Sequence, residues 1–176
     1  MMRMMGLAGW SGAGKTTLIK RLLPSLVARG FSVSTVKHAH HRFDIDHPGK
    51  DSFAHREAGA KEVLIVSGER FALMHELRGD DEPDLKKLLT LMTPVDFVIV
   101  EGFKSEAYPK IEIHRAENGK AFLHPDDERI LAVATDHPEA ITVRPSFDLA
   151  DIEAIADFIV AHAAPVEEVL GVLTRS

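Results

Sequence analysis

The stretch Gly9-Trp-Ser-Gly-Ala-Gly-Lys-Thr16 decides the fold of this chain. It matches the pattern G-x-x-x-x-G-K-S/T, and a short apolar segment, residues 3–9, runs into it. After it, leucine and valine recur at three- and four-residue steps over residues 15–29, which predicts an amphipathic helix. Gly30 follows where a helix end favours glycine, and residues 31–36 resemble a second strand. The order strand, glycine loop, helix, strand predicts a βαβ unit with parallel strands.

This loop is a P-loop, and its residue types suit phosphate binding. Glycines let the backbone turn tightly, so that successive N–H groups point inward around an anion. The helix that follows adds the positive end of its dipole. We expect Lys15 to reach the β- and γ-phosphates and the Thr16 hydroxyl to bind Mg²⁺. A chance glycine turn is the alternative, and the strand–helix context argues against it.

Composition limits the class of protein. The chain has 176 residues, of which 45 % are hydrophobic and 27 % charged, as in an ordinary globular protein. A net charge of −6 argues against a nucleic-acid partner, and no apolar run approaches the roughly 18 residues of a membrane span. The absence of cysteine excludes disulfides and thiolate metal sites, so a cytoplasmic location is the expectation.

Strand and helix patterns alternate along the rest of the chain. Further strands are expected at residues 62–66, 70–74, 95–100, 110–114 and 130–134, and further helices at residues 51–58, 85–92 and 149–162. The run 62–66 has the apolar character of a buried strand, and 70–74 is a candidate to pair with it. This alternation predicts an α/β, P-loop NTPase-like three-layer sandwich with a mainly parallel central sheet and some antiparallel strands. We expect a single nucleotide-binding domain over residues 1–176, in which residues 163–176 form a short C-terminal tail or helix.

A P-loop also needs a carboxylate near its magnesium ion. The strand expected at 95–100 has one at each end, Asp96 and Glu101, about 16 Å apart. Ligands of open α/β sheets lie beyond the carboxyl ends of the strands, where the glycine loop also lies. Glu101 is therefore the candidate for holding the metal or positioning a water, against the alternative of a solvated charge. We expect Asp96 to cap the start of the strand.

Five of the ten histidines fall between His38 and His55, in a polar segment that follows the second strand. One interpretation is a loop that binds an anionic substrate through Lys37, His38, Lys50 and Arg56. A second is a transition-metal site built from His38, His40 and His41 with Asp44 and Asp46, although this spacing matches no standard zinc pattern. A third is a solvated loop without a ligand.

Recognition of a base rests on a weaker signal. The Asn-Lys-x-Asp guanine pattern is absent, but Thr135-Asp136 follows the apolar run 130–134. A carboxylate accepts hydrogen bonds only, as the donor edge of guanine requires. The alternative, equally compatible with the residues, is that Asp136 caps the turn before Pro138.

Several motifs in order resemble one family, the molybdopterin-guanine dinucleotide biosynthesis accessory protein B (MobB). They are Gly9-Trp-Ser-Gly-Ala-Gly-Lys-Thr-Thr17, Val36-Lys-His-Ala-His-His41, Asp46-His-Pro-Gly-Lys-Asp-Ser52, Ala58-Gly-Ala60 and Val100-Glu-Gly-Phe-Lys104. The resemblance spans about residues 5–160 in pattern. It lies in the ordered set, because many unrelated functions share the P-loop alone.

The resemblance implies a GTP-binding, usually dimeric protein with weak GTP hydrolysis at most. It implies a role assisting a guanylyltransferase (MobA-like) that joins GMP to molybdopterin, with molybdopterin itself a possible ligand. By position, the phosphate- and Mg²⁺-binding residues are Gly12, Ala13, Gly14, Lys15, Thr16 and Thr17. Glu101 takes the catalytic and metal-binding place, and Thr135 and Asp136 the guanine-reading turn. Lys37, His38 and Lys50 lie in family motifs that touch either the pterin phosphate or the partner.

Two other functions remain open from the residues. One is a small-molecule kinase, in which the His-rich loop would hold the acceptor. Such kinases usually close an arginine-bearing lid over the phosphates, but Arg115, Arg129 and Arg144 are scattered and form no obvious lid. The other is a metal-delivering GTPase that would bind its metal through histidine and aspartate.

Overall fold

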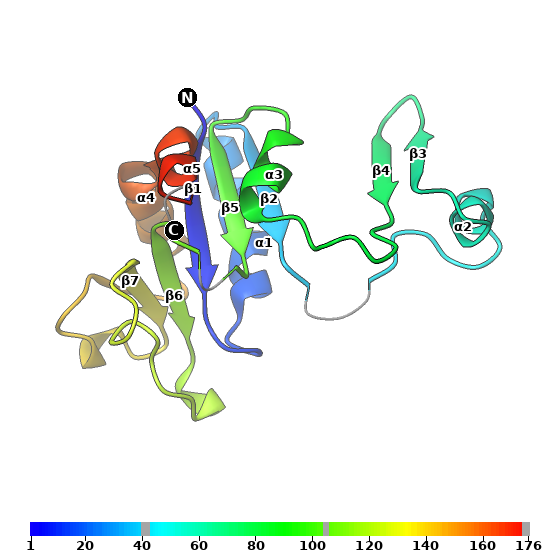
Figure 1. The fold of residues 1–176 in the computed structure, drawn as a ribbon. Coiled ribbons are helices and arrows are strands. Elements are labelled where there is room, and N and C mark those ends of the chain that lie inside the picture. The colour runs from blue at the N-terminus through cyan, green and yellow to red at the C-terminus, as the bar shows by residue number, and fades with distance from the viewer. Residues whose placement is uncertain (40–42, 104–105, 174–176) are drawn as a thin grey trace. The chain divides into compact units, whose positions relative to one another are not determined.

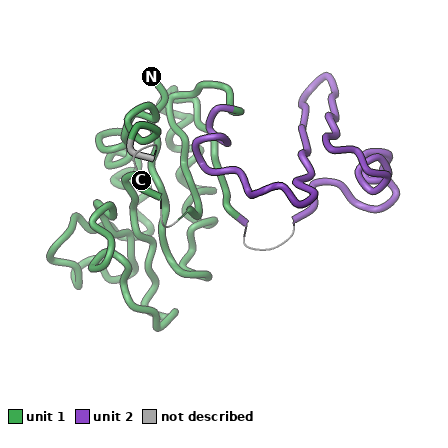
Figure 2. The backbone as a smooth tube through the Cα atoms, in the orientation of Figure 1, with its two compact units in different colours: residues 1–38, 91–176 green, residues 39–90 purple. Residues whose placement is uncertain are grey.

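The computed structural model describes residues 1–39, 43–103 and 106–173, without the side chains of residues 172 and 173. The chain divides into two compact units, residues 1–38 with 91–176 and residues 39–90 (Figure 2). The expectation of a single domain did not anticipate this division. Each unit is described by itself.

The first unit is built on a central sheet in the strand order β2-β5-β1-β6-β7-β8, with β9 paired to β1 (Figure 1). The strands are β1 (Arg3–Ala8), β2 (Val33–Lys37), β5 (Phe97–Glu101), β6 (Lys110–His114), β7 (Ile130–Thr135), β8 (Ser146–Asp148) and β9 (Ala164–Pro165). All neighbours pair in parallel except β9, which is antiparallel to β1. The predicted α/β class with a mainly parallel sheet is confirmed.

The helices of this unit are α1 (Lys15–Ala28), α4 (Ile152–His162) and α5 (Val166–Leu173), with short 3₁₀ turns η1 (Ala116–Asn118) and η2 (Pro138–Ala140). The predicted helices at 15–29 and 149–162 are therefore confirmed, the second with a later start. The Asp151 carboxylate sets that start, since it accepts a hydrogen bond from the Ala154 N–H as an N-cap. The C-terminal tail forms a helix from Val166, one of the two expected forms.

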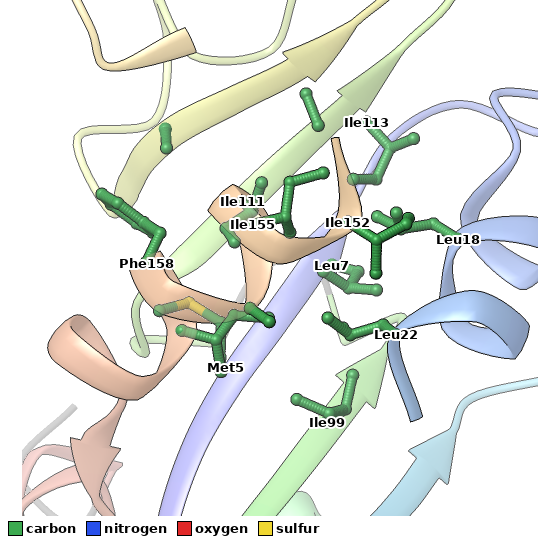
Figure 3. Packing of buried hydrophobic residues seen from close by; sticks show 14 of the residues in the cluster. Met5, Leu7, Leu18, Leu22, Ile99, Ile111, Ile113, Ile152, Ile155 and Phe158 are labelled. Carbon is green, nitrogen blue, oxygen red and sulfur yellow. The ribbon is translucent and has the colours of Figure 1, made fainter. Parts of the chain in front are cut away.

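The core lies between α1, α4 and one face of the sheet (Figure 3). Alternate residues of β1, Met5 and Leu7, point to this face and pack with Leu22 of α1 and Ile155 of α4. On the opposite face Met4 is fully buried too. A sheet covered on both faces explains why its strands are near-continuous apolar runs.

The second unit, residues 39–90, contains α2 (Asp51–Glu57), β3 (Glu62–Val66), β4 (Phe71–His75) and α3 (Leu85–Thr90). The strands β3 and β4 form an antiparallel two-stranded sheet, so the expected pairing is confirmed. The expectation that residues 62–66 are buried is wrong, because within β3 only Val63 is buried. Leu64 and Val66 are 62 % and 72 % exposed, since a two-stranded sheet leaves one face open.

Candidate functional site

The P-loop connects the end of β1 to the start of α1, as the sequence predicts. Gly12 and Gly14 have φ angles of 80° and 96°, which L side chains rarely adopt. At Gly9 a Cβ atom would lie 2.4 Å from the Ile113 carbonyl oxygen of β6. These glycines therefore give the loop its turn and its close approach to β6, as expected for a backbone anion nest.

Lys15 lies across this loop. Its ammonium donates hydrogen bonds to the carbonyl oxygens of Gly9 and Trp10, each at 2.9 Å. Thr16 and Thr17, in the first turn of α1, are exposed. A lysine tethered to the loop and open hydroxyls at a helix N-terminus form the expected layout of a phosphate site.

Glu101 ends β5, the strand between β2 and β1. In the parallel register it lies opposite Leu7 of β1 and Lys37 of β2. Phe97 and Ile99 belong to the core beside α1, so alternation along β5 points Glu101 to the same face as that helix. The Lys37 ammonium lies 3.8 Å from the Glu101 carboxylate, and the Glu101 side chain is only 13 % exposed.

Asp96 behaves differently, as expected. It lies at the start of β5, where its carboxylate accepts hydrogen bonds from the N–H and the hydroxyl of Ser32 at 2.8 and 2.7 Å. These bonds from Ser32 lower the pKa of Asp96 below its usual value. The sequence assignment of Asp96 to a structural role at the far edge is therefore confirmed.

The turn after Glu101 is fixed by hydrogen bonds and a ring contact. The His38 N–H donates to the Glu101 carbonyl at 2.8 Å, and the His38 and Phe103 rings lie with centroids 4.7 Å apart. The Tyr108 hydroxyl donates to the Gly102 and Phe103 carbonyl oxygens. His38 thus contributes to the shape of the site edge beside Glu101.

Thr135 and Asp136 end β7 at the same edge. One oxygen of the Asp136 carboxylate accepts hydrogen bonds from the Ala116 N–H at 3.1 Å and the Thr135 hydroxyl at 3.2 Å. Burial alone would raise the pKa of Asp136, but the hydrogen bonds from Ala116 and Thr135 outweigh it and lower that pKa. Asp136 therefore ties β7 to the segment after β6, a structural role that the sequence did not predict.

That segment, residues 115–121, packs against the P-loop. The Trp10 indole N–H donates to the Ala121 carbonyl at 2.9 Å, and the Asn118 amide lies 3.5 Å from the Ser11 carbonyl. A Cβ atom at Gly14 would lie 3.0 Å from Nε of Arg115. The sequence placed Arg115 among three scattered arginines that form no obvious lid and did not predict its position beside Gly14. Only the pairing of β6 with β1 places it at the loop.

A buried carboxylate holds the residues that follow this segment. Glu112, which is 0 % exposed, accepts hydrogen bonds from the Leu123 and His124 N–H groups at 2.6 and 2.9 Å and from the His124 ring at 3.0 Å. These donors compensate the charge of a carboxylate that water does not reach. Residues 115–124, which we call the wall beside the P-loop, are thus held by hydrogen bonds from β6, from Asp136 after β7 and from the P-loop itself.

The remaining predicted residues lie in the second unit. Lys50 precedes α2 as its N-cap residue. Arg56 is bound to carboxylates of its own unit, with Asp46 at 2.8 Å, Asp44 at 3.1 Å and Glu76 at 3.3 Å. Arg56 is therefore a structural cation in this structure, which weakens its assignment to an anionic substrate.

The metal interpretation finds no support in the described residues. His40 and His41 lie outside them, and Asp44 and Asp46 pair with Arg56. Within residues 1–39, 43–103 and 106–173, no group of three or more metal-ligating side chains could hold an ion.

The second unit also has a cavity of about 700 Å³, whose lining includes Phe43, Phe53, Arg56, Leu73 and Arg78. None of the P-loop residues lines it. We take the P-loop edge as the candidate site because the chemistry-bearing strand ends gather there.

Comparisons with known proteins identify the family of this chain. The family model described as "Molybdopterin guanine dinucleotide synthesis protein B" matches residues 4–136. A molybdopterin-guanine dinucleotide biosynthesis adapter protein of Escherichia coli K12 is 42% identical over 166 residues, covering 91% of this chain and 93% of the relative. Its Haemophilus influenzae counterpart is 44% identical over 156 residues, covering 89% and 86%.

Solved structures extend the likeness to the fold. A crystal structure of molybdopterin-guanine biosynthesis protein B superposes with a TM-score of 0.69 at 29% identity, covering 90% of this chain and 98% of that one. None of the helices in the described part of the chain is long and apolar enough to cross a membrane. The extent of the family match, the identity to the relatives and the shared fold lead to one conclusion: this chain belongs to the molybdopterin-guanine dinucleotide synthesis protein B (MobB) family.

Proposed function

We propose that this protein binds GTP at its P-loop and acts as an adapter in molybdopterin-guanine dinucleotide biosynthesis, for a guanylyltransferase that joins GMP to molybdopterin. The observation that carries the proposal is the P-loop itself, formed between β1 and α1, with Glu101 at the end of the neighbouring strand. The adapter role is drawn from the relatives, whose names describe adapters of this biosynthesis.

The phosphates occupy the loop formed by Gly12, Ala13 and Gly14, with Lys15 turning from the loop carbonyls toward them. Mg²⁺ fits the donors present, because the Thr16 hydroxyl and the Glu101 carboxylate are the oxygen ligands this ion prefers. When bound, the ion would neutralise phosphate charge. Glu101 orients a water or the metal shell, and Lys37 holds its carboxylate in place at 3.8 Å.

Guanine recognition belongs to Thr135 and Asp136. One Asp136 oxygen is already engaged by Ala116 and Thr135, which fixes the carboxylate. Its second oxygen accepts from the guanine edge. Lys37, His38 and Lys50 lie in the family motifs that meet the pterin phosphate or the partner.

Hydrolysis is weak in this proposal, so the protein is an accessory rather than an independent enzyme. The Glu101 carboxylate lies beside the Lys37 ammonium, which favours its ionised form as a ligand for the metal or its water. Binding of the nucleotide without rapid hydrolysis suits a protein whose partner catalyses the guanylyl transfer.

We also propose that the protein forms a homodimer through its small sheet. One face of this sheet carries Leu64 paired with Leu73 and Val66 paired with Phe71. Their exposed fractions are 62 % for Leu64, 51 % for Leu73, 72 % for Val66 and 73 % for Phe71. A second copy covers such a face without charge complementarity, because a two-fold contact sets the same apolar patch against itself. Light scattering on Leu64→Asp should then show a monomer, whereas a dimeric variant would contradict this interface.

The test of the adapter role is a pull-down with the guanylyltransferase, with and without GTP and molybdopterin. We expect capture that strengthens with GTP and is lost in Lys15→Ala. Absence of capture under every condition would contradict the role. Transfer of phosphate from the nucleotide to a metabolite would instead identify a small-molecule kinase.

A further inference from the structure

A cation that the sequence did not assign lies against the nucleotide loop. Arg115 follows β6 directly, and β6 pairs in parallel with β1, the strand that leads into the P-loop. The position that a Cβ atom would take on Gly14 lies 3.0 Å from Nε, 3.5 Å from a terminal nitrogen and 3.7 Å from the central carbon of Arg115. The guanidinium therefore lies beside the glycine that precedes Lys15.

The backbone that carries Arg115 is fixed on several sides. The next residue, Ala116, donates its N–H to Asp136, and the Arg115 carbonyl accepts from the Asn118 N–H at 3.1 Å. Trp10 of the P-loop is bonded to Ala121 in the same segment. The backbone that carries the guanidinium is therefore rigid. A rigid backbone lowers the entropy that is lost when the side chain binds a ligand.

In the described part of the chain, no carboxylate is paired with this guanidinium. Among the residues that the structure describes, none accepts a hydrogen bond from the Arg115 side chain or forms an ion pair with it. Two other half-buried arginines are paired with acids: Arg29 with Glu153 and Asp157, and Arg56 with Asp44, Asp46 and Glu76. A half-buried cation left without a counter-ion beside an anion nest suits an anion supplied from outside.

We propose that Arg115 is a phosphate-binding residue of this site, which contributes its guanidinium to the polyphosphate of the bound nucleotide beside the ammonium of Lys15. The proposal rests on the proposed nucleotide binding. Arginine presents a planar fork of donors that bridges two phosphate oxygens, whereas lysine acts as a point charge. The two cations are thus complementary, one from the loop and one from the end of β6.

The test compares Arg115→Ala and Arg115→Lys with a matched control, Lys20→Ala, which removes a cation from an exposed position on α1. Binding of GTP, GDP and GMP is measured by calorimetry, and unfolding without nucleotide by differential scanning calorimetry. We expect Arg115→Ala to weaken GTP binding about 10- to 100-fold and GMP binding less, with a shallower salt dependence. Arg115→Lys should recover part of the affinity, and Lys20→Ala should match the wild type.

Several outcomes would overturn the assignment. Binding of GTP by Arg115→Ala within twofold of the wild type would do so. Equal weakening for GTP and GMP, together with a lower unfolding temperature without nucleotide, would show that Arg115 only braces Gly14. If Arg115→Ala does not fold, Arg115→Gln keeps the length without the charge and must show the same loss. Failure of the wild type to bind any nucleotide would instead refute the proposed function.

Discussion

The wall beside the P-loop depends on one buried carboxylate, and Glu112→Gln tests this. The two Glu112 oxygens accept three hydrogen bonds, one from the Leu123 N–H and two from His124. Glutamine has one carbonyl oxygen, so whichever way its amide turns, at least one buried N–H faces an NH₂ group. An unsatisfied buried donor costs about 1–3 kcal/mol, and a lost charge-assisted bond adds to it.

We therefore expect Glu112→Gln to lower the free energy of unfolding by about 2–4 kcal/mol. For a chain of this size that corresponds to a fall in melting temperature of roughly 4–16 °C. Calorimetry measures the global effect. The fluorescence of Trp10, the single tryptophan, reports locally, because its indole is bonded to Ala121 in the anchored segment.

The control is Glu117→Gln, which makes the same chemical change at an exposed position of η1. It should change stability by less than about 0.5 kcal/mol. If Glu112→Gln behaved like this control, the argument that Glu112 anchors the wall would be refuted.

Three further predictions concern the metal, the base and the core. Glu101→Gln should change the Mg²⁺ dependence or rate of GTP hydrolysis more than GTP affinity; a large loss of affinity with unchanged hydrolysis would count against its role. Asp136→Asn keeps an acceptor for Ala116 but sets an amide against guanine, so calorimetry should show about tenfold weaker GTP binding with ATP binding unchanged. An unaltered preference would remove Asp136 from base recognition. Leu22→Ala, at a fully buried position of α1, should lower the free energy of unfolding by about 2–5 kcal/mol, measured by thermal unfolding. A loss below about 1 kcal/mol would show that the core around Leu22 closes over the cavity.

The elements that the sequence predicted well are those with a strong local signal. The P-loop carries its own motif, and β5 is an apolar run with Asp96 and Glu101 at its ends, so strand direction alone separated their roles. The structural role of Asp96 followed from its place at the edge of the sheet away from the P-loop, where its carboxylate accepts hydrogen bonds from Ser32.

The features that were missed depend on residues far apart along the chain. Alternation identified a strand at residues 110–114 but not its place between β1 and β7, where Glu112 is buried with donors supplied by residues 123 and 124. Arg115 reaches the P-loop only through that same pairing. The apolar run of β3 was taken for a core strand, because periodicity does not distinguish burial in a core from exposure on a small sheet.

The division into two units was also hidden. No glycine- or serine-rich linker separates residues 39–90 from the rest of the sequence. From the sequence, residues 39–90 could be described only as a series of predicted helices and strands whose position in the sheet was not known.

The decisive measurement for GTP binding at the P-loop is a calorimetric titration of the wild type and of Lys15→Ala with Mg–GTP and Mg–ATP. We expect the wild type to bind GTP more tightly than ATP. Folded Lys15→Ala should bind neither, since it lacks the ammonium held at Gly9 and Trp10. Equal affinity for the two nucleotides, or unchanged affinity in folded Lys15→Ala, would contradict this expectation.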